Sequence, residues 1–389
     1  MITRRSLLSI LITFPAISKA TAFNFQLPDE HIDKTVNSVA DIKYIDLFDG
    51  MIVKTRGFYY PEKESSMLYR VIFGKNVKIA HSIKVGREIF IIPIYKDVIS
   101  FKQLGLKMDG HYDDTLTLRK ILANEGQYYF NEGHLIVKNH IELGPNVRVI
   151  GSGMATSIIE YRNTKNSWLF VNGEKGNPNF IKRSGYSGRG NYFLSDFSIN
   201  LRGDLAEKSR SAMIFGRSKN VFLHNIHFYN GKNSHRIECN AQEDFTISNC
   251  IFSDTIISQS GSHEEINIDY NNKSGFPAYG SWDNSSCKRV NILSCKFINV
   301  QKGVASHSNP EKHHQSIIIS DCLFKNTSSN AIQLQAIDNS FIENCTFIDC
   351  KKTAIRLINA HGNTIKNIHS DQAVSVKSDR KSTNNHFLK

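Results

Sequence analysis

The residues of this sequence that could do chemistry fall at matching positions in five short segments. The segments are aligned by the apolar residues Ile237, Ile266, Val304, Ile332 and Ile355. One position later stand Glu238, Asn267, Ala305, Gln333 and Arg356, and three positions later stand Asn240, Asp269, His307, Gln335 and Ile358. Carboxylates and histidines are common general acids and bases, whereas amides and arginine hydrogen-bond polar substrates. The two series therefore predict one reactive polar face.

The separation of the two carboxylate residues indicates a type of reaction. If the segments are adjacent strands, Glu238 and Asp269 are one strand apart and two residues along, which places their backbones ~8 Å apart. This matches the ~6.5–9.5 Å between the carboxyl groups of inverting glycosidases, in which one group protonates the leaving oxygen and the other activates water. His307 lies one strand beyond Asp269, close enough for a hydrogen bond that would shift either pKa. We expect Glu238 and Asp269 to be the essential carboxylates, supported by His307.

Two further acidic residues are alternative catalytic candidates. A slip of one residue in the alignment would turn Asp269 toward the interior and change the site. Glu265 opens the same segment as Asp269, and Asp283 lies in the insertion that follows it. Either residue would replace Asp269 if the register were wrong.

The insertion supplies aromatic residues beside the predicted carboxylates. The interval of 45 residues between 247 and 292 makes this turn about 20 residues longer than the others, and its segment 271–287 includes Phe276, Tyr279 and Trp282. Aromatic rings stack on sugar faces, and loops on a rigid scaffold often carry binding residues. The predicted substrate-binding residues are Asn240, Asn267, Tyr279, Trp282, Gln333, Gln335 and Arg356.

Two other functions fit the same polar face. In a lyase that eliminates across a uronic acid, His307 or Tyr270 would be the base, and Arg356 or Asn267 would neutralise the substrate carboxylate. A non-catalytic protein that binds a glycan or assists its assembly could use the face without cleaving the chain. The residues alone leave these alternatives open.

No metal or cofactor is predicted. The seven cysteines form no CxxC pair, and their odd number argues against a complete disulfide framework. No compact aspartate cluster suggests calcium. We interpret His313-His314 as a solvated turn rather than a metal site.

An internal repeat predicts the fold that must position these residues. An apolar residue, two mostly polar residues, Cys or Ile, any residue and then usually Phe recur from residues 223, 247, 292, 319, 342 and 365, at intervals of 24, 45, 27, 23 and 23. Periods of this length with alternating polarity and Asn, Asp or Ser turns are typical of short strands in a coil. We predict an all-β protein, a single right-handed parallel β-helix. One interior column would contain Cys250, Cys295, Cys322 and Cys345 as small buried hydrophobes.

The region before the repeat resembles known β-helix proteins. Residues 104–122, which contain Asp109-Gly110 and Asp113-Asp114-Thr115, resemble the opening motif of pectate-lyase-like β-helices, which leads into a helix. Residues 38–72 resemble the β-rich segment that precedes the helix in bacteriophage tailspike polysaccharide depolymerases. The resemblance covers about residues 38–150, and the repeat extends it to about 370. It implies a polysaccharide-degrading enzyme acting on a bacterial exopolysaccharide or capsule-type glycan, with a trimer possible.

The same resemblance organises the chain into domains. We expect a small β-rich domain over 23–100, the β-helix over 101–375 and a C-terminal tail over 376–389. A capping helix near 113–123 would close the open end of the coil, with Asp113 or Asp114 as its N-cap. The acidic residues of the opening motif are therefore interpreted as structural.

The first 22 residues read as an export signal, which tailspikes lack. Arg4 and Arg5 form a charged start, residues 7–17 a short apolar stretch, and residues 18–20 a small-x-small cleavage site. The paired arginines also resemble a twin-arginine signal, so either export route is open. The expected location is periplasmic or secreted.

Charge and hydropathy limit the partners. No stretch reaches the ~18–20 apolar residues of a membrane span, so no stable membrane anchor is expected. The chain has 48 Lys and Arg against 36 Asp and Glu, a formal charge of +12, spread without the basic and aromatic clusters typical of nucleic-acid binding. An anionic polysaccharide is the expected partner, drawn in by long-range attraction.

Overall fold

The computed structural model describes residues 30–388 apart from residues 166, 174–183, 259–260, 262, 274–281, 308–311, 351–352 and 372–374. The predicted export signal, residues 1–22, lies outside the described residues, as does Tyr279. Among the described residues, no helix is long and apolar enough to cross a membrane.

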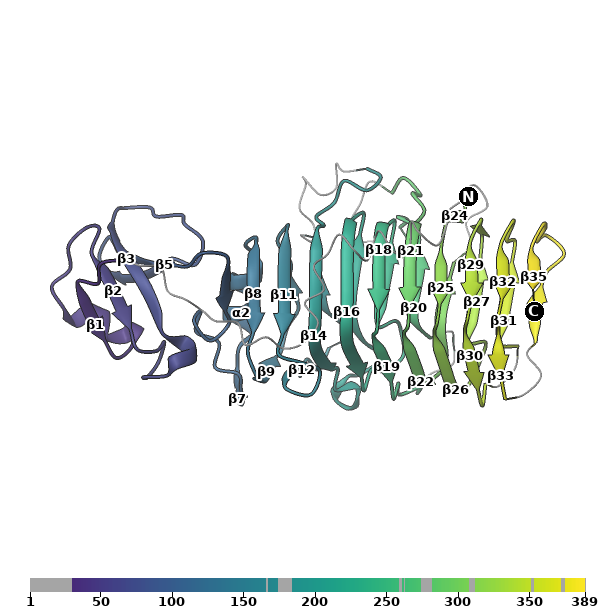
Figure 1. The fold of residues 1–389 in the computed structure, drawn as a ribbon, viewed down its shortest axis with the longest axis horizontal. Coiled ribbons are helices and arrows are strands. Elements are labelled where there is room, and N and C mark those ends of the chain that lie inside the picture. Colours follow the sequence, from purple (N-terminus) through teal and green to yellow (C-terminus); the bar gives the residue numbers. More distant parts are fainter. Residues whose placement is uncertain are drawn as a thin grey trace.

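The described chain forms a long parallel β-helix with a small β domain at one end (Figure 1). One long wall is a nine-stranded sheet of β10 (Ile141–Glu142), β13 (Ser167–Val171), β15 (Arg210–Gly216), β17 (Ile237–Asn240), β20 (Glu264–Asp269), β23 (Lys302–Ser306), β27 (Ile332–Gln335), β31 (Ile355–Ile358) and β34 (Val376–Ser378). Every pairing in this sheet is parallel, as the predicted fold requires.

The other walls belong to a 21-stranded sheet. Along the coil it contains β6 (Val98–Ser100), β7 (Asp109–Asp113), β8 (Gly126–Phe130), β9 (Gly133–Val137), β11 (Val147–Gly151), β12 (Ser157–Tyr161), β14 (Tyr192–Asn200), β16 (Lys219–Tyr229), β18 (Glu243–Ser248), β19 (Ile251–Ser253), β21 (Lys288–Leu293), β22 (Lys296–Val300), β24 (His314–Gln315), β25 (Ile318–Ser320), β26 (Leu323–Thr327), β28 (Ile337–Asp338), β29 (Phe341–Glu343), β30 (Thr346–Ile348), β32 (Thr364–Lys366), β33 (His369–Ser370) and β35 (His386–Leu388). A short 3-10 helix, η3 (Gly203–Leu205), lies in one turn.

Each turn of the coil bends at a residue in the left-handed conformation. These corner residues immediately precede the Cys or Ile of the repeat, with φ between 50° and 56°, and are Asn225, Asn249, Ser294, Asp321, Asn344 and Asn367. Asn and Asp tolerate this conformation because their short side chains hydrogen-bond locally. The polar part of the repeat therefore encodes the corner between two strands.

The predicted interior column of thiols is confirmed. The backbone N–H groups of Lys296, Leu323 and Thr346 donate to the carbonyls of Cys250, Cys295 and Cys322, which places the cysteines on successive turns. All four column cysteines are buried, and all seven cysteines of the chain are free thiols. Beside this column the rings of Phe228, Phe252, Phe297, Phe324 and Phe347 stack with centroids 4.8–5.0 Å apart.

The small N-terminal domain packs directly on the first turn of the coil. It consists of β1 (Lys34–Val36), β2 (Ile52–Thr55), β3 (Met67–Phe73), β4 (Ile83–Gly86) and β5 (Ile89–Ile94), with 3-10 helices η1 (Val39–Tyr44) and η2 (Lys63–Ser65). The hydroxyl of Tyr59 donates to the carbonyl of Gly105 at 2.8 Å. Gly105 has φ +84°, and a Cβ there would meet the ring of Phe58 at 2.5 Å, so this contact requires glycine.

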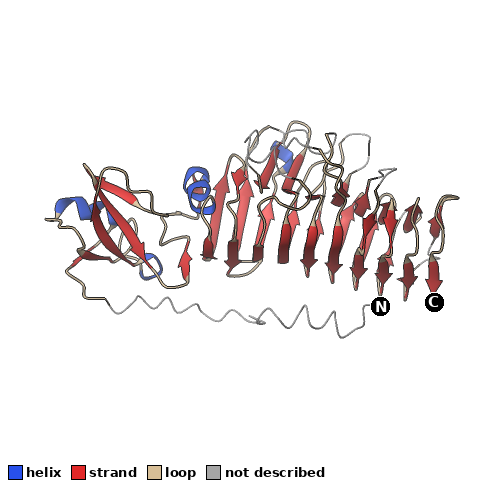
Figure 2. Ribbon diagram, turned by 90° about the horizontal axis from the view of Figure 1, so that it is seen from above, coloured by secondary structure: helices blue, strands red, loops and turns tan. Residues whose placement is uncertain are grey.

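The predicted helix is α2 (Thr115–Leu122), which covers the first end of the coil (Figure 2). Asp113 caps it by accepting a hydrogen bond from the backbone N–H of Thr115 at 3.1 Å. Asp114 occupies the N-cap position but makes no side-chain cap; its buried carboxylate accepts hydrogen bonds from the backbone of Lys107 and Met108. The acidic residues of the opening motif thus shape a loop and a helix start.

The coil is longer at both ends than the sequence indicates. At its start, β6 already pairs with β8 from Val98. At its end, β34 and β35 continue both sheets, so residues 376–388 form further turns and the expected tail there is incorrect. The last turns lack the Cys and Phe of the repeat, which is why their continuation was not visible in the sequence.

Candidate active site

Strand pairing places both series of polar residues as the sequence alignment requires. Glu238 pairs with Asn267, Asn267 with Ala305, Ala305 with Gln333, and Gln333 with Arg356, in one continuous column. In the second series Asn240 pairs with Asp269 and Gln335 with Ile358. His307 follows the end of β23, and its backbone N–H donates to the carbonyl of Ile268, next to Asp269. The insertion after β20 therefore causes no slip of register.

The polar side chains of this face are largely buried, although strand alternation places them outside the coil. Glu238 and Asp269 are 5% and 3% exposed, and Asn240 and Asn267 are fully buried. The amide of Asn240 donates to Oε1 of Glu238 at 3.1 Å, so these side chains bond to one another rather than to water. Sequence alternation identified which side chains leave the coil, but it could not indicate how closely they pack.

Asp269 and His307 form the closest charged contact of the predicted site. His307 Nδ1 lies 2.9 Å from Asp269 Oδ2, and the backbone N–H of Tyr270 donates to Asp269 Oδ1 at 2.7 Å. The hydrogen bond to Asp269 raises the pKa of His307 against the opposing effect of burial. The side chain of His307 is 44% exposed, so it forms the solvent-facing part of this pair.

The surroundings of Glu238 favour its protonated, uncharged form. Burial raises the pKa of Glu238 above its usual range, and the neighbouring Asp269 acts in the same direction, while His235 and His307 oppose it. A carboxyl group with a raised pKa and a second carboxyl group hydrogen-bonded to an imidazole are complementary partners in acid–base catalysis. The geometry can therefore support Glu238 as the acid and Asp269 as the base.

A second ionic group lies beside these residues and was not predicted from the sequence. Glu264 Oε2 lies 3.0 Å from His235 Nδ1, and Lys302 Nζ lies 3.3 Å from Glu264 Oε1. The rings of His235 and His307 are 6.3 Å apart, which joins the two groups. The signal available in the sequence was the register: Glu264 pairs with Lys302 on adjacent strands.

The two alternative carboxylates are engaged in other contacts. Glu265 is buried, lies 3.7 Å from Arg236 Nε and accepts a hydrogen bond from the hydroxyl of Thr255. Although burial acts in the opposite direction, hydrogen bonds from Asn271 and from the backbone of Gly185 and Ser285 lower the pKa of Asp283 to about 2. An acid held ionised by these bonds is a poor proton donor, and it serves to fix the loop.

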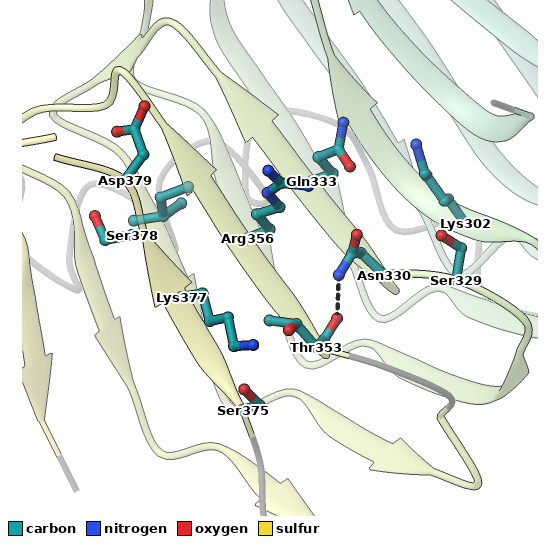
Figure 3. Close-up of a pocket in the computed structure, with 11 residues that line it drawn as sticks. Lys302, Ser329, Asn330, Gln333, Thr353, Arg356, Ser375, Lys377, Ser378 and Asp379 are labelled. Atoms are coloured by element: carbon teal, nitrogen blue, oxygen red, sulfur yellow. Dashed lines mark hydrogen bonds between the residues drawn. The ribbon is translucent and has the colours of Figure 1, made fainter. Parts of the chain in front are cut away.

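A cationic groove lies farther along the nine-stranded sheet, toward its C-terminal strands (Figure 3). It has a volume of about 850 Å³ and is lined by the charged residues Lys302, Arg356, Lys377 and Asp379 and by polar side chains that include Gln333. Arg356 and Gln333 extend side by side into it from adjacent strands. Lys302 both lines the groove and contacts Glu264, so the groove begins beside the second ionic group.

The remaining predicted binding residues have varied positions. Trp282 is 39% exposed, and Lys273 Nζ lies over its ring, 5.6 Å from the ring centre. Gln335 is half-buried on β27, and its backbone N–H is bound by the hydroxyl of Ser306. Tyr279 falls in the part of the insertion that is not described.

The His313-His314 pair is not a solvated turn. His314 is buried, its ring lies 4.2 Å from that of Tyr270, and its Nδ1 accepts the backbone N–H of Cys287. Burial lowers the pKa of His314 to about 3, so it is a neutral core residue. The sequence interpretation failed because β24 turns His314 inward while His313 stays at the surface. Tyr270 is fully buried, with its ring packed against that of His314.

Solved structures share this architecture. No protein-family model and no curated protein matches the sequence significantly. Pantoea stewartii WceF, described as a glycan biofilm modifying enzyme with a tailspike-like parallel β-helix fold, aligns with a TM-score of 0.57 and 11% identity over 91% of this chain and 50% of its own. The fold is a tailspike-like parallel β-helix.

Two phage proteins support the same assignment of fold. The enzymatically active domain of tailspike protein 2 from bacteriophage CBA120 aligns with a TM-score of 0.54 and 11% identity, over 98% of this chain and 55% of that domain. The gp42 tailspike of an Acinetobacter phage aligns with a TM-score of 0.53 and 10% identity, over 92% of this chain and 73% of its own. At these identities the likeness concerns the fold.

Proposed function

We propose that this protein is a polysaccharide depolymerase that cleaves an anionic bacterial glycan by inverting hydrolysis. The observation that carries the proposal is that a buried Glu238, whose pKa burial raises, stands one strand from Asp269, which is hydrogen-bonded to His307. Glu238 protonates the glycosidic oxygen as the bond breaks, and Asp269 removes a proton from the attacking water. WceF, a protein of similar fold that is described as a glycan biofilm modifying enzyme, agrees with this class of substrate.

The charge of the groove supports an anionic substrate. Lys302, Arg356 and Lys377 line it together with one carboxylate, Asp379. Guanidinium and ammonium groups bind sugar carboxylates through charge-assisted hydrogen bonds. Gln333 adds an uncharged donor and acceptor for hydroxyl groups. We infer that the chain of sugars lies along the nine-stranded sheet, with its cleaved bond beside Glu238 and Asp269.

Elimination at a uronic acid is the second candidate, since the groove's cations would neutralise a uronate and His307 is exposed at the end of the site. The hydrogen bond to Asp269 occupies His307 Nδ1 and raises the pKa of the ring, which favours the protonated form over the basic form that elimination needs. Hydrolysis is therefore the preferred reaction. A protein that only binds the glycan would use the same groove without releasing fragments.

Product analysis tests the proposal and separates its alternatives. Incubation with acidic exopolysaccharides is expected to release new reducing ends without the ultraviolet absorbance of an unsaturated uronate, and proton NMR of early products should show inverted anomers. Asp269→Asn should abolish this release, with its fold unchanged by circular dichroism. Unsaturated products would establish the lyase, and binding without fragments would establish the third function.

We also propose that the protein acts outside the cytoplasm, on the basis of the charged, apolar and cleavage-site segments of residues 1–22. Fractionation of producing cells and N-terminal sequencing of the mature protein test this. A mature chain starting near residue 21 in the periplasm or medium is the expected result; an intact first residue in the cytoplasm would contradict it.

A further inference from the structure

A cluster of two histidines and an aspartate lies outside the proposed catalytic site. His313 precedes β24, Asp338 ends β28 and His361 forms bridges to Asp338 and Thr383, so the three residues come from successive turns of the coil. One ligand atom from each lies within 4.8 Å of the others. A tetrahedral zinc ion with bonds of about 2.0 Å spaces its ligands about 3.3 Å apart, so small side-chain rotations would close the site.

The hydrogen bonds around the histidines are arranged as around metal-binding imidazoles. His313 Nδ1 faces Asp338 Oδ1 at 2.8 Å, while its Nε2 lies 3.2 Å from the amide of Asn359. His361 Nδ1 is held by the hydroxyl of Thr383 at 2.8 Å, which leaves Nε2 for an ion. Histidine ligands of metals commonly use one ring nitrogen for the ion and the other for such an orienting partner. The two rings are parallel, with centroids 5.3 Å apart.

We propose that His313, Asp338 and His361 form a binding site for a divalent transition-metal ion, with zinc the best match. Two imidazole nitrogens and one carboxylate oxygen are a typical zinc donor set, whereas calcium and magnesium prefer oxygen ligands alone. The ion takes the place of the proton between His313 Nδ1 and Asp338, and that proton moves to the other ring nitrogen. With the ion on His313 Nδ1, Nε2 carries the proton and donates to the amide oxygen of Asn359 after a flip of that amide.

The location gives the ion a structural role beside the groove. It links three consecutive turns that are joined mainly through pairings of neighbouring turns and through the contact of His313 with Asn359. The backbone N–H of Asn359 donates to Asp379, one of the residues lining the groove. A bound ion therefore holds together the turns that present Gln333 and Arg356.

Titration of zinc chloride into the chelator-treated full chain tests the site. Calorimetry should show one equivalent bound, and saturating zinc should raise the melting temperature because the ion binds the folded state. Asp338→Asn and His361→Gln are close in shape to the native residues, and each should weaken zinc binding at least tenfold and remove the thermal shift. His369→Gln, which changes an exposed histidine elsewhere on the coil, should leave both unchanged.

Several outcomes would overturn the proposal. The absence of a zinc-dependent thermal shift in the wild-type chain is one, and equal zinc affinity in Asp338→Asn, His361→Gln and wild type is another. Loss of binding in His307→Gln instead would place the ion at the Asp269–His307 pair. Circular dichroism and the metal-free melting temperature show whether each variant is folded, and two independent variants keep the test decisive.

Discussion

The interior of the coil and the outer face of its nine-stranded sheet use the same turns in opposite ways. In the interior, Cys follows Cys and Phe follows Phe, with rings stacked 4.8–5.0 Å apart. On the outer face, one column reads Glu238, Asn267, Ala305, Gln333 and Arg356 on consecutive strands. Identical residues stack well and hold the register, so the outer face can change at every turn without loss of the fold. Repetition identifies the scaffold, and departure from repetition identifies the site.

The largest effect expected from this contrast is on turnover, through Glu238→Gln. The substitution keeps the shape of the side chain but removes the proton that the acid must deliver, so turnover should fall at least ~100-fold with an unchanged melting temperature. Glu343→Gln is the matched control, since this glutamate lies on the 21-stranded sheet and pairs with Lys366. Steady-state kinetics of both variants measure the difference; near-normal cleavage by Glu238→Gln would move the acid elsewhere.

The next largest effect concerns the interior column. Cys322→Ser buries a hydroxyl where the thiol packs as a hydrophobe, and should cost about 1–3 kcal/mol of unfolding free energy. Cys350→Ser, at a half-buried thiol, should cost less. Urea denaturation of both variants gives the comparison. Equal stability of wild type and Cys322→Ser would speak against close packing of the column.

A smaller effect is expected in the groove. Arg356→Gln removes a positive charge that faces the proposed anionic chain, and should raise KM several-fold on an acidic glycan with little change in kcat. The increase should shrink at high salt, because screening already weakens the attraction in the wild type. Kinetics at two ionic strengths test this; an equal KM for wild type and Arg356→Gln would argue against the groove as the binding surface.

The smallest effect is the pH dependence of stability contributed by His307. Its pKa is raised in the folded protein by the hydrogen bond to Asp269, so this stabilisation is complete below the unfolded pKa and is lost as pH rises through the folded one. Unfolding free energy should therefore decline as pH rises above about 6.5, the ordinary pKa of histidine, more steeply in wild type than in His307→Gln. Denaturation across this range measures it; parallel curves for the two proteins would show that the contact does not stabilise the fold.

The sequence predicted the scaffold better than the surroundings of the site. The repeat could be extrapolated through the insertion to place Glu238 and Asp269 on adjacent strands. This worked because the apolar residues of each strand must face the interior, which leaves only one register for each pair of strands. The repeat did not reveal the contact between Glu264 and His235, because the alternation of polar and apolar residues does not hold at the start of a strand. Nor did it reveal the burial of His314, since successive residues of a strand point to opposite faces and the sequence did not show which of the two histidines points inward.

The two carboxylates come from different turns of the coil, and this limits how the reaction of such a protein can change during evolution. Side chains on this sheet occupy a lattice about 4.8 Å by 6.6 Å, so the gap between two acids changes in fixed steps rather than by small adjustments. Moving one acid by a single lattice point would cross from the spacing that admits a water molecule to the ~5 Å at which the second carboxylate attacks the sugar directly. Descendants of this chain could thus exchange one stereochemical outcome for the other by a single relocation, with the coil unchanged.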